Sequence, residues 1–499
     1  MVSIQVDGEI DSVTIAEGSS VQQALEMENI TLSSIDRVTP PPYTLISNNL
    51  LIIITRIREE FETQQIILPY SRQELRNESL TSGEIRLIQA GQNGIEEITI
   101  RHIFENDVES GSSVVSEKIL QEPVSEIVMI GVQSPYSPIT IPGKLAYLTG
   151  GNAWIMDGST SNRWPAITSG DLDGHIFNLS PDGNWLLFTR KPSDEESDEI
   201  NSLWVISTSR QSSSPIALGV SNVIHFADWQ PNQTYSIAYS TVEPSSTAPG
   251  WDANNDLHFI KFSGGKPGED REILDTNYGG IYPWWGMNFC WSPDGEQLAF
   301  SRPDGIGIVD VNTANLNILK AITPLNTHGD WAWNSNIAWG LNNEMLYFTD
   351  HAEPTGLISP EDSPNFNLSS IAIDSSSEDL LASQTGMFAY PSPSPIRNSQ
   401  GVTTQFLAYM QAIFPNQSAL SRYKLIVSEM DGSNPKTLFP IEGQSGLEPQ
   451  KPTWAPESME NGNIYLAVIY DGNLWILDAQ TGFSQQVTGD GLTKSIDWK

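Results

Sequence analysis

The sequence predicts a mainly β protein. Its larger part is expected to be a seven-bladed β-propeller closed by the C-terminal strand, preceded by a small α+β domain and an elongated β-ribbon domain. Three observations support this. The turn Ser-Pro-Asp-Gly follows Trp291 between two apolar strands and occurs again from Ser180. Four-strand units repeat at intervals of about 40 to 60 residues, as in propeller blades. The last strand, residues 495–498, matches residues 288–291 but has no partner after it in sequence.

Residues 1–58 are expected to form the small α+β domain. Ser20 is a suitable N-cap for a helix that runs to Glu28, with Val21 and Leu25 on its apolar face. The alternating apolar stretches of the same region predict strands at residues 3–6, 12–15 and 50–56.

Residues 59–132 are expected to form the elongated β-ribbon domain, because long alternating stretches are separated by glycines that suit turns or kinks. The expected strands are residues 62–69, 83–89, 94–103, 111–122 and 127–131. The run Gln-Ala-Gly-Gln-Asn-Gly at residues 89–94 and the stretch 122–131 resemble the G-five domain, which is named for its glycines. The preceding Val-Asp-Gly at residues 6–8 and the stretch 21–25 resemble the ubiquitin-like domain that often precedes it.

Residues 133–143 carry three prolines and are expected to be a linker. The propeller is expected from residue 144 to residue 499. The first unit lacks the strand that should precede Leu145, so we expect the C-terminal strand to pair beside it and remove two exposed edges. The most apolar strand of each unit is predicted at residues 145–148, 185–188, 236–239, 298–300, 345–348, 406–409 and 464–468.

These units and their turns are similar to TolB-like repeats, which also form the N-terminal propellers of prolyl oligopeptidases. The sequence has no Gly-x-Ser-x-Gly elbow after the repeats, so the resemblance does not extend to the peptidase half. The G-five and ubiquitin-like resemblances point to bacterial cell-surface and cell-wall-associated proteins. They imply an extracellular or cell-surface location, with a leader removed or absent from this chain.

The composition narrows the class of partner. There are 61 Asp and Glu residues against 25 Lys and Arg, a formal net charge of -36. Such a charge repels nucleic acid and anionic membrane surfaces. No apolar run is long enough to span a membrane. The protein is expected to be a monomer. The single cysteine, Cys290, excludes an internal disulfide and is interpreted as a buried, inert thiol.

Tryptophan is the unusual residue type, with 15 copies. Five of them occupy one repeated strand position and are interpreted as packing residues between blades: Trp229, Trp291, Trp339, Trp454 and Trp498. Other aromatic and polar residues break the repeat, in connections that lead into a new blade, and such residues suit a ligand face. The candidate ligand-binding residues are Tyr282, Trp284, Trp285, His328, Asp330, Trp331, Trp333, Asp171, Asp173, His175 and His225. Plugging of the central channel is the alternative role for these aromatics.

No cofactor is expected, although two metal hypotheses remain open. Asp171, Asp173 and the acidic run 252–256 carry oxygen ligands that suit calcium, but neither has the spacing of an EF-hand loop. His175, His225 and His328 can alternatively converge on the propeller axis as metal ligands. Solvated turn residues are the simpler interpretation of the acidic groups.

The expected function is non-catalytic binding, with the propeller as the head on a cell-wall-associated stalk and a glycan or cell-envelope protein as ligand. One alternative is a polysaccharide lyase or hydrolase that uses His and Asp on the same loop face. The other is a TolB-like protein-interaction scaffold. An enzyme needs an acid and a base within reach of one substrate, whereas a binding head needs only an aromatic platform.

Overall fold

The computed structural model describes residues 1–499 except 17, 78–79, 81–82, 132–135, 195–196, 212, 234, 264, 278, 355 and 400–401. In this described part the protein is mainly β, with one α-helix and two short 3-10 helices, Pro360–Asp362 and Pro415–Gln417. The chain divides into two compact units, residues 1–131 and 132–499. None of the described helices has the length and apolar character that a membrane span needs.

The first part of unit 1 is a four-stranded mixed sheet with one helix, α1 (Val21–Met27), packed on it. Ser20 caps the helix, accepting a bond from the backbone N–H of Gln23, while the Gln23 side chain accepts one from the Ser20 N–H. This capping box satisfies two otherwise unpaired amides and confirms the predicted helix start. The strand order is β2-β1-β4-β3, with β1 Val2–Val6, β2 Glu9–Val13, β3 Arg37–Thr39 and β4 Leu51–Thr55.

Arg56 joins this small sheet to the strand that follows it. Its guanidinium lies 2.8 Å from the carboxylate of Asp36 and 3.1 Å from that of Asp7. Asp36 also accepts a bond from the backbone N–H of Ile57, and the backbone N–H groups and Arg56 together outweigh burial, so the pKa of Asp36 lies far below its usual range. The acidic residues of the small sheet therefore fix the first residues of β5.

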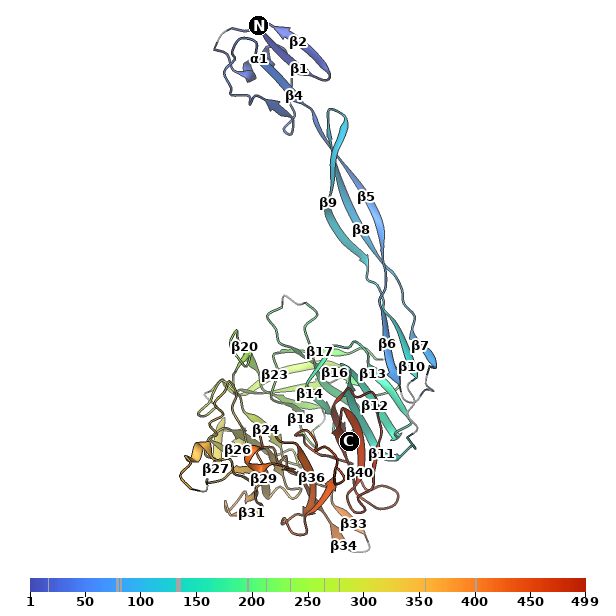
Figure 1. Ribbon diagram of the computed structural model, residues 1–499, viewed down its shortest axis with the longest axis vertical. Coiled ribbons are helices and arrows are strands. Elements are labelled where there is room, and N and C mark those ends of the chain that lie inside the picture. Colours follow the sequence, from blue (N-terminus) through green and yellow to red (C-terminus); the bar gives the residue numbers. More distant parts are fainter. Residues whose placement is uncertain are drawn as a thin grey trace. The chain divides into compact units, whose positions relative to one another are not determined.

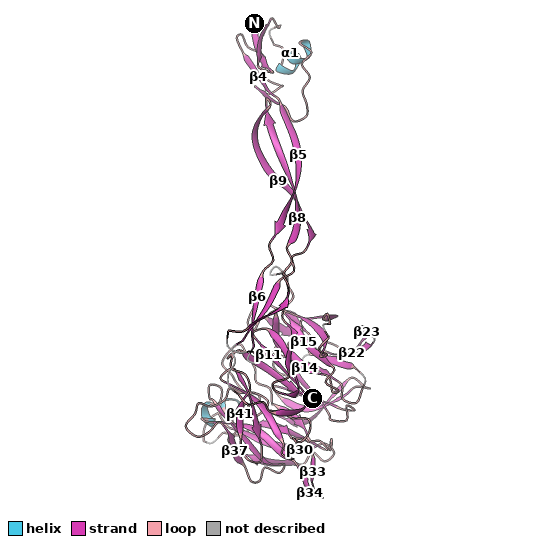
Figure 2. Ribbon diagram, turned by 90° about the vertical axis from the view of Figure 1, so that its right-hand side faces the viewer, coloured by secondary structure: helices cyan, strands magenta, loops and turns pink. Residues whose placement is uncertain are grey.

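Two three-stranded sheets complete unit 1, in the orders β5-β8-β9 and β6-β10-β7. The strands of the first sheet are long and twisted, as Figure 2 shows. Gly94 begins β8 where a Cβ would lie 2.5 Å from the carbonyl oxygen of Gln121, so only glycine fits. The strands are β5 Ile57–Leu68, β6 Arg72–Asn77, β7 Ile85–Gln89, β8 Gly94–Glu105, β9 Val108–Gln121 and β10 Glu126–Gly131.

Unit 2 contains, among the described residues, seven antiparallel four-stranded sheets. Each predicted central strand falls on a strand that pairs on both sides. The first four sheets are built from β11 Thr140–Thr149, β12 Asn152–Ser159, β13 Arg163–Ile167 and β42 Thr493–Trp498; β14 Leu172–Leu179, β15 Trp185–Arg190, β16 Ser202–Ser207 and β17 Ile216–Ser221; β18 Ala227–Trp229, β19 Ser236–Tyr239, β22 Leu257–Ser263 and β23 Lys266–Leu274; and β24 Asn288–Trp291, β25 Leu298–Arg302, β26 Gly305–Asp310 and β27 Asn315–Ala321 (Figure 1).

The remaining three sheets follow the same order along the chain. They are built from β28 Ile337–Trp339, β29 Met345–His351, β30 Phe366–Ala372 and β31 Glu378–Ala382; β32 Ser392–Pro393, β35 Phe406–Ala412, β36 Tyr423–Glu429 and β37 Lys436–Phe439; and β38 Thr453–Trp454, β39 Tyr465–Tyr470, β40 Asn473–Asp478 and β41 Ser484–Gln486. Two hairpins are inserted between strands of the third and sixth sheets: β20 Val242–Pro244 with β21 Trp251–Ala253, and β33 Arg397–Ser399 with β34 Val402–Thr404.

The predicted pairing of the C-terminal strand is present. β42 pairs antiparallel with β11, with Leu145 opposite Trp498 and Leu148 opposite Ser495. The first sheet is therefore assembled from the two ends of unit 2. Strand β11 begins at Thr140, inside the range predicted as a linker, and residues 133–135 of that range lie outside the described part of the chain.

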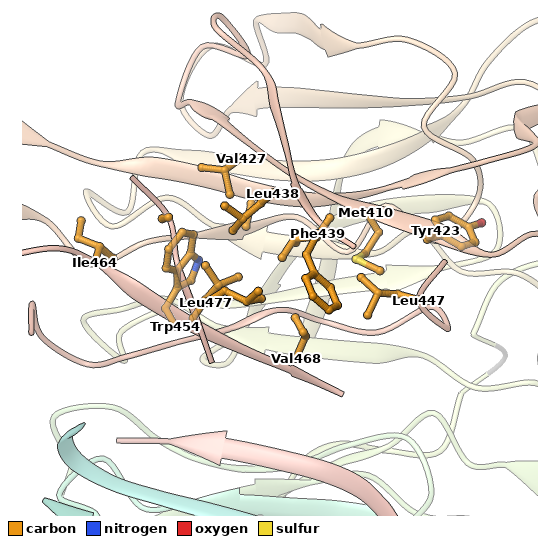
Figure 3. Packing of buried hydrophobic residues seen from close by; sticks show 14 of the residues in the cluster. Met410, Tyr423, Val427, Leu438, Phe439, Leu447, Trp454, Ile464, Val468 and Leu477 are labelled. Atoms are coloured by element: carbon orange, nitrogen blue, oxygen red, sulfur yellow. The ribbon is translucent and has the colours of Figure 1, made fainter. Parts of the chain in front are cut away.

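The hydrophobic core of unit 2 lies between successive sheets. Figure 3 shows one such layer, a single buried cluster to which the sixth sheet contributes Met410 and Leu438 and the seventh contributes Leu477. The five repeated tryptophans are all buried, which confirms their predicted packing role. Three of them donate their indole N–H to a carbonyl in the preceding sheet, in the pairs Trp229–Asn178 (3.1 Å), Trp339–Cys290 (2.9 Å) and Trp454–Ser392 (2.8 Å).

Candidate ligand-binding site

Four of the predicted site residues lie together. Tyr282, Trp284 and Trp285 occupy the connection from β23 to β24, and His225 lies in the connection from β17 to β18. All four residues are half-buried, and His225 is the most enclosed of them, since its Nε2 has no exposed surface. Their ring centroids follow one another at 6.5 Å (Tyr282 to Trp284), 5.8 Å (Trp284 to Trp285) and 6.2 Å (Trp285 to His225).

A fifth ring, Trp251, completes the group and was missed from the sequence. It begins β21 in the inserted hairpin, and its centroid lies 5.9 Å from that of Trp285 and 5.7 Å from that of His225. The Trp251 indole N–H donates to the carbonyl of Trp285 at 3.4 Å, and the amide of Asn255 donates to the carbonyl of Pro283 at 2.8 Å. The hairpin is thus fastened to the 282–285 connection. We call Tyr282, Trp284, Trp285, Trp251 and His225 the aromatic cluster.

His225 is the inner member of the aromatic cluster. Burial, together with the nearby charge of His175, lowers the pKa of His225 to about 4, so the imidazole is neutral at neutral pH. Gly286 passes directly over this ring with φ +110°, and a Cβ there would lie 2.5 Å from Cδ2 of His225. Only glycine permits both this backbone conformation and this approach. A neutral imidazole beside three indoles makes an apolar, aromatic surface.

Asp171 and Asp173 have structural partners. Two guanidinium nitrogens of Arg190 lie 2.9 and 2.7 Å from one carboxylate oxygen of Asp171, and the same guanidinium stacks 4.9 Å over the ring of Trp204. Asp173 accepts bonds from the Asn201 amide at 2.9 Å and from the hydroxyl of Thr189. These carboxylates therefore hold the second sheet together. The exposed His175 differs from them, since its ring faces solvent.

The predicted residues at 328–333 separate into exposed and buried positions. His328 is 72% exposed, and its Nε2 lies 3.1 Å from a carboxylate oxygen of Asp362. Asp330 is also exposed, and Trp331 is half-buried. Trp333 is only 2% exposed, and its indole N–H donates to the carbonyl of Met387 at 2.8 Å. The ring of Trp333 is therefore part of the core between sheets, and we leave it out of the ligand face.

The three histidines do not converge on a metal. His328 pairs with Asp362, while His225 lies against Trp251 and Trp285. In the described part of the chain, no group of three or more His, Cys, Asp or Glu residues is arranged to hold an ion. Asp256 in the predicted acidic run is buried and bonds to Ser240 and Thr241. The carboxylates suggested for calcium thus serve local hydrogen bonding.

Comparison with protein families identifies two modules in unit 1. Residues 59–133 match the G5 domain, and residues 2–42 match the G5-linked-Ubiquitin-like domain. The chain therefore carries a G5 domain preceded by its associated ubiquitin-like domain, which confirms both resemblances found in the sequence. The resuscitation-promoting factor Rpf2 of Corynebacterium glutamicum is 24% identical over 175 residues, which are 35% of this chain and 45% of that protein. The match thus spans less than half of the relative's length.

Solved structures match parts of this chain at low similarity. TolB from Acinetobacter baumannii is 12% identical with a TM-score of 0.35, and the match covers 75% of this chain and 95% of that one. A prolyl endopeptidase structure is 12% identical with a TM-score of 0.42, over 72% of this chain and 50% of that one. The IgA1 protease G5 domain is 22% identical with a TM-score of 0.13, over 16% of this chain and 94% of that domain.

Proposed function

We propose that this chain is a non-catalytic, extracellular or cell-surface binding protein, and that the aromatic cluster of unit 2 recognises a glycan. The observation that carries the proposal is the contiguous set of half-buried rings around Trp285, with centroids 5.7 to 6.5 Å apart. Sugar rings present apolar faces that stack on indoles, and their hydroxyls accept and donate hydrogen bonds. The G5 domain supports the proposed location, since such domains belong to the cell-surface proteins that the sequence resembles.

We further infer that the seven sheets are the blades of a propeller, completed by β42. The support is the pairing of β42 with β11 and the packing of each sheet's core against the next. The domains we propose are residues 1–58, 59–132 and 144–499, with 133–143 as the linker. In this arrangement the connections that carry the aromatic cluster lie on one loop face. A monomer that binds a glycan or a cell-envelope protein through this face is the arrangement we propose.

The test is a glycan array probed with the full chain and with Trp284→Ala. Loss of one stacking indole is expected to weaken binding roughly tenfold, as for an aromatic hot spot. Trp164→Ala is the matched control, because Trp164 is also half-buried but lies on β13, outside the aromatic cluster. If no glycan binds, or if both variants bind like the wild type, the glycan proposal fails. Pull-down of an envelope protein that depends on Trp284 would then favour the protein ligand.

A lyase or hydrolase is the second candidate, and the contact between His328 and Asp362 is the observation that favours it. A histidine beside a carboxylate can act as a general base. The pair is largely exposed, however, and solvent weakens such contacts. Release of reducing ends or unsaturated products from polysaccharides, abolished by His328→Gln, would establish the enzyme. Absence of product with polysaccharides that bind the chain would exclude this candidate for those ligands.

A further inference from the structure

A cavity of about 520 Å³ lies in unit 2 where the first strands of several sheets meet. Its lining comes from β14, β32, β38 and β42, which are far apart in sequence but are each the edge strand of a four-stranded sheet. The volume falls within the usual range of small-molecule sites. None of the aromatic cluster residues lines it, although His175, whose charge acts on His225 of the cluster, does.

The lining is unusually rich in lysine. Lys451, Lys494 and Lys499 are three of the eleven lysines in a chain with 61 acidic residues, yet all three border this one cavity. Asp497 is the acidic residue of the lining. One of its carboxylate oxygens accepts the Leu179 amide at 2.7 Å, and the other lies 3.8 Å from Nζ of Lys499. The positive charge of Lys499 is therefore balanced by the negative charge of Asp497.

The other two lysines are uncommitted. Across the described residues, neither the Lys451 nor the Lys494 ammonium group forms a hydrogen bond or an ion pair with the protein. Both residues are exposed, so their ammonium groups are accessible to a ligand that enters the cavity.

Asp228 on β18 is a further carboxylate that interacts with the lysines of the lining. Burial raises the pKa of Asp228 to about 6, and the charge of Lys499, followed by that of Lys451, opposes this rise. Its Oδ1 accepts the backbone N–H of Trp229 at 2.8 Å. Asp228 thus interacts electrostatically with Lys499 and Lys451, and its negative charge reduces the attraction of this lining for an anion.

We propose that this cavity binds a small anionic ligand, a carboxylate or a phosphate, through the ammonium groups of Lys451 and Lys494. Charge-assisted hydrogen bonds to these groups are among the stronger non-covalent contacts. A chain with a net charge of -36 repels anions at long range, so two unpaired cations inside a cavity form a local exception. The proposal stands independently of the glycan platform.

The test is isothermal titration of the full chain with acetate and with inorganic phosphate, against acetamide as the neutral probe. Acetate or phosphate is expected to bind where acetamide does not, and which of them binds identifies the anionic group. Lys451→Gln and Lys494→Gln are each expected to weaken binding roughly tenfold, the loss of one charged hydrogen bond. Asp228→Asn is expected to tighten binding, because it removes this negative charge.

The matched control is Lys424→Gln on β36, which removes an exposed lysine outside the cavity and changes the net charge equally. The anion affinity of Lys424→Gln is expected to equal that of the wild type. The proposal is overturned if neither anion binds, or if Lys451→Gln and Lys494→Gln bind like Lys424→Gln. If a lysine variant fails to fold, Asp228→Asn decides, since unchanged or weaker anion binding would contradict the proposal.

Discussion

At the scale of single residues, His258 on β22 lies between two carboxylates. Its Nε2 is 3.3 Å from Asp256 and its Nδ1 is 3.3 Å from Asp270. The contact with Asp256, reinforced by Asp270, raises the pKa of His258. A histidine whose pKa is higher in the folded state than in the unfolded state stabilises the protein. The full stabilisation is present at pH values below the unfolded-state pKa of about 6.5, and it is lost as the pH rises through the folded-state pKa.

We therefore expect His258→Gln to lower the free energy of unfolding by about 1.5 kcal/mol at pH 6, the order of one charged hydrogen bond, and by less at pH 9. Denaturant unfolding of both proteins at the two pH values measures the difference. His328→Gln is the control, because its pair with Asp362 is largely exposed and contributes little. An equal loss for His258→Gln at both pH values would contradict this account.

Gly286 offers a second test at this scale. Gly286→Ala is expected to cost roughly 2 kcal/mol of stability, since the backbone is strained at φ +110° for any other residue and the added Cβ meets His225. Gly443→Ala separates the two causes, because Gly443 has φ +91° but open space where its Cβ would lie. Only Gly286→Ala is expected to change the tryptophan fluorescence of the aromatic cluster. The same change in Gly443→Ala would show that strain alone is responsible.

At the scale of elements, the first sheet depends on β42. Removing residues 492–499 is expected to expose the edge of β11 and the core beneath it, so unit 2 should unfold at lower denaturant concentration and aggregate. Removing residues 1–131 is the comparison: it deletes far more chain but leaves all seven sheets intact. Circular dichroism melts measure both. A shortened chain without β42 that unfolds like the intact protein would exclude the proposed role of this strand.

The strands themselves were largely predictable from the sequence. Apolar runs bounded by Ser-Pro-Asp-Gly turns predict β15 and β25, and the Trp at the end of β24 or β28 predicts burial between sheets. Short strands with little apolar character were missed, among them β3 and β6. Periodicity is too weak a signal over three to six polar residues. The inserted hairpin of β20 and β21 was missed for the same reason.

The candidate site was less predictable, because it depends on contacts between distant segments. Trp331 and Trp333 are two residues apart and look alike in sequence, yet only Trp333 reaches Met387 in a later connection and becomes buried. The cavity lysines carry no local motif either. His175 and Lys494 line one cavity only because β14 and β42 belong to adjoining sheets. The residues that break the repeat can be found in the sequence. Which of them contact one another depends on the tertiary structure.

At the scale of the whole molecule, the charge of -36 is the dominant feature. Like charges on a compact surface repel one another, and salt screens this repulsion with a Debye length of about 10 Å at 0.1 M. We expect the melting temperature to rise by roughly 2 to 4 °C between 10 mM and 200 mM NaCl, the shift that about 1 kcal/mol produces in a sizeable domain. Calorimetry or fluorescence melts of the full chain give the value.

Melting temperatures measured in different salts distinguish charge screening from a specific calcium site. The many acidic residues of the sequence are compatible with either. With screening alone, CaCl₂ and MgCl₂ at equal ionic strength raise the melting temperature equally. A calcium site adds stability by mass action, so Ca²⁺ at millimolar concentration would give a further rise that EDTA reverses. The side chains of Asp171, Asp173 and Asp256 already serve local hydrogen bonds or ion pairs, so we expect equal shifts for the two cations. A melting temperature that stays flat or falls with NaCl would contradict the repulsion argument itself.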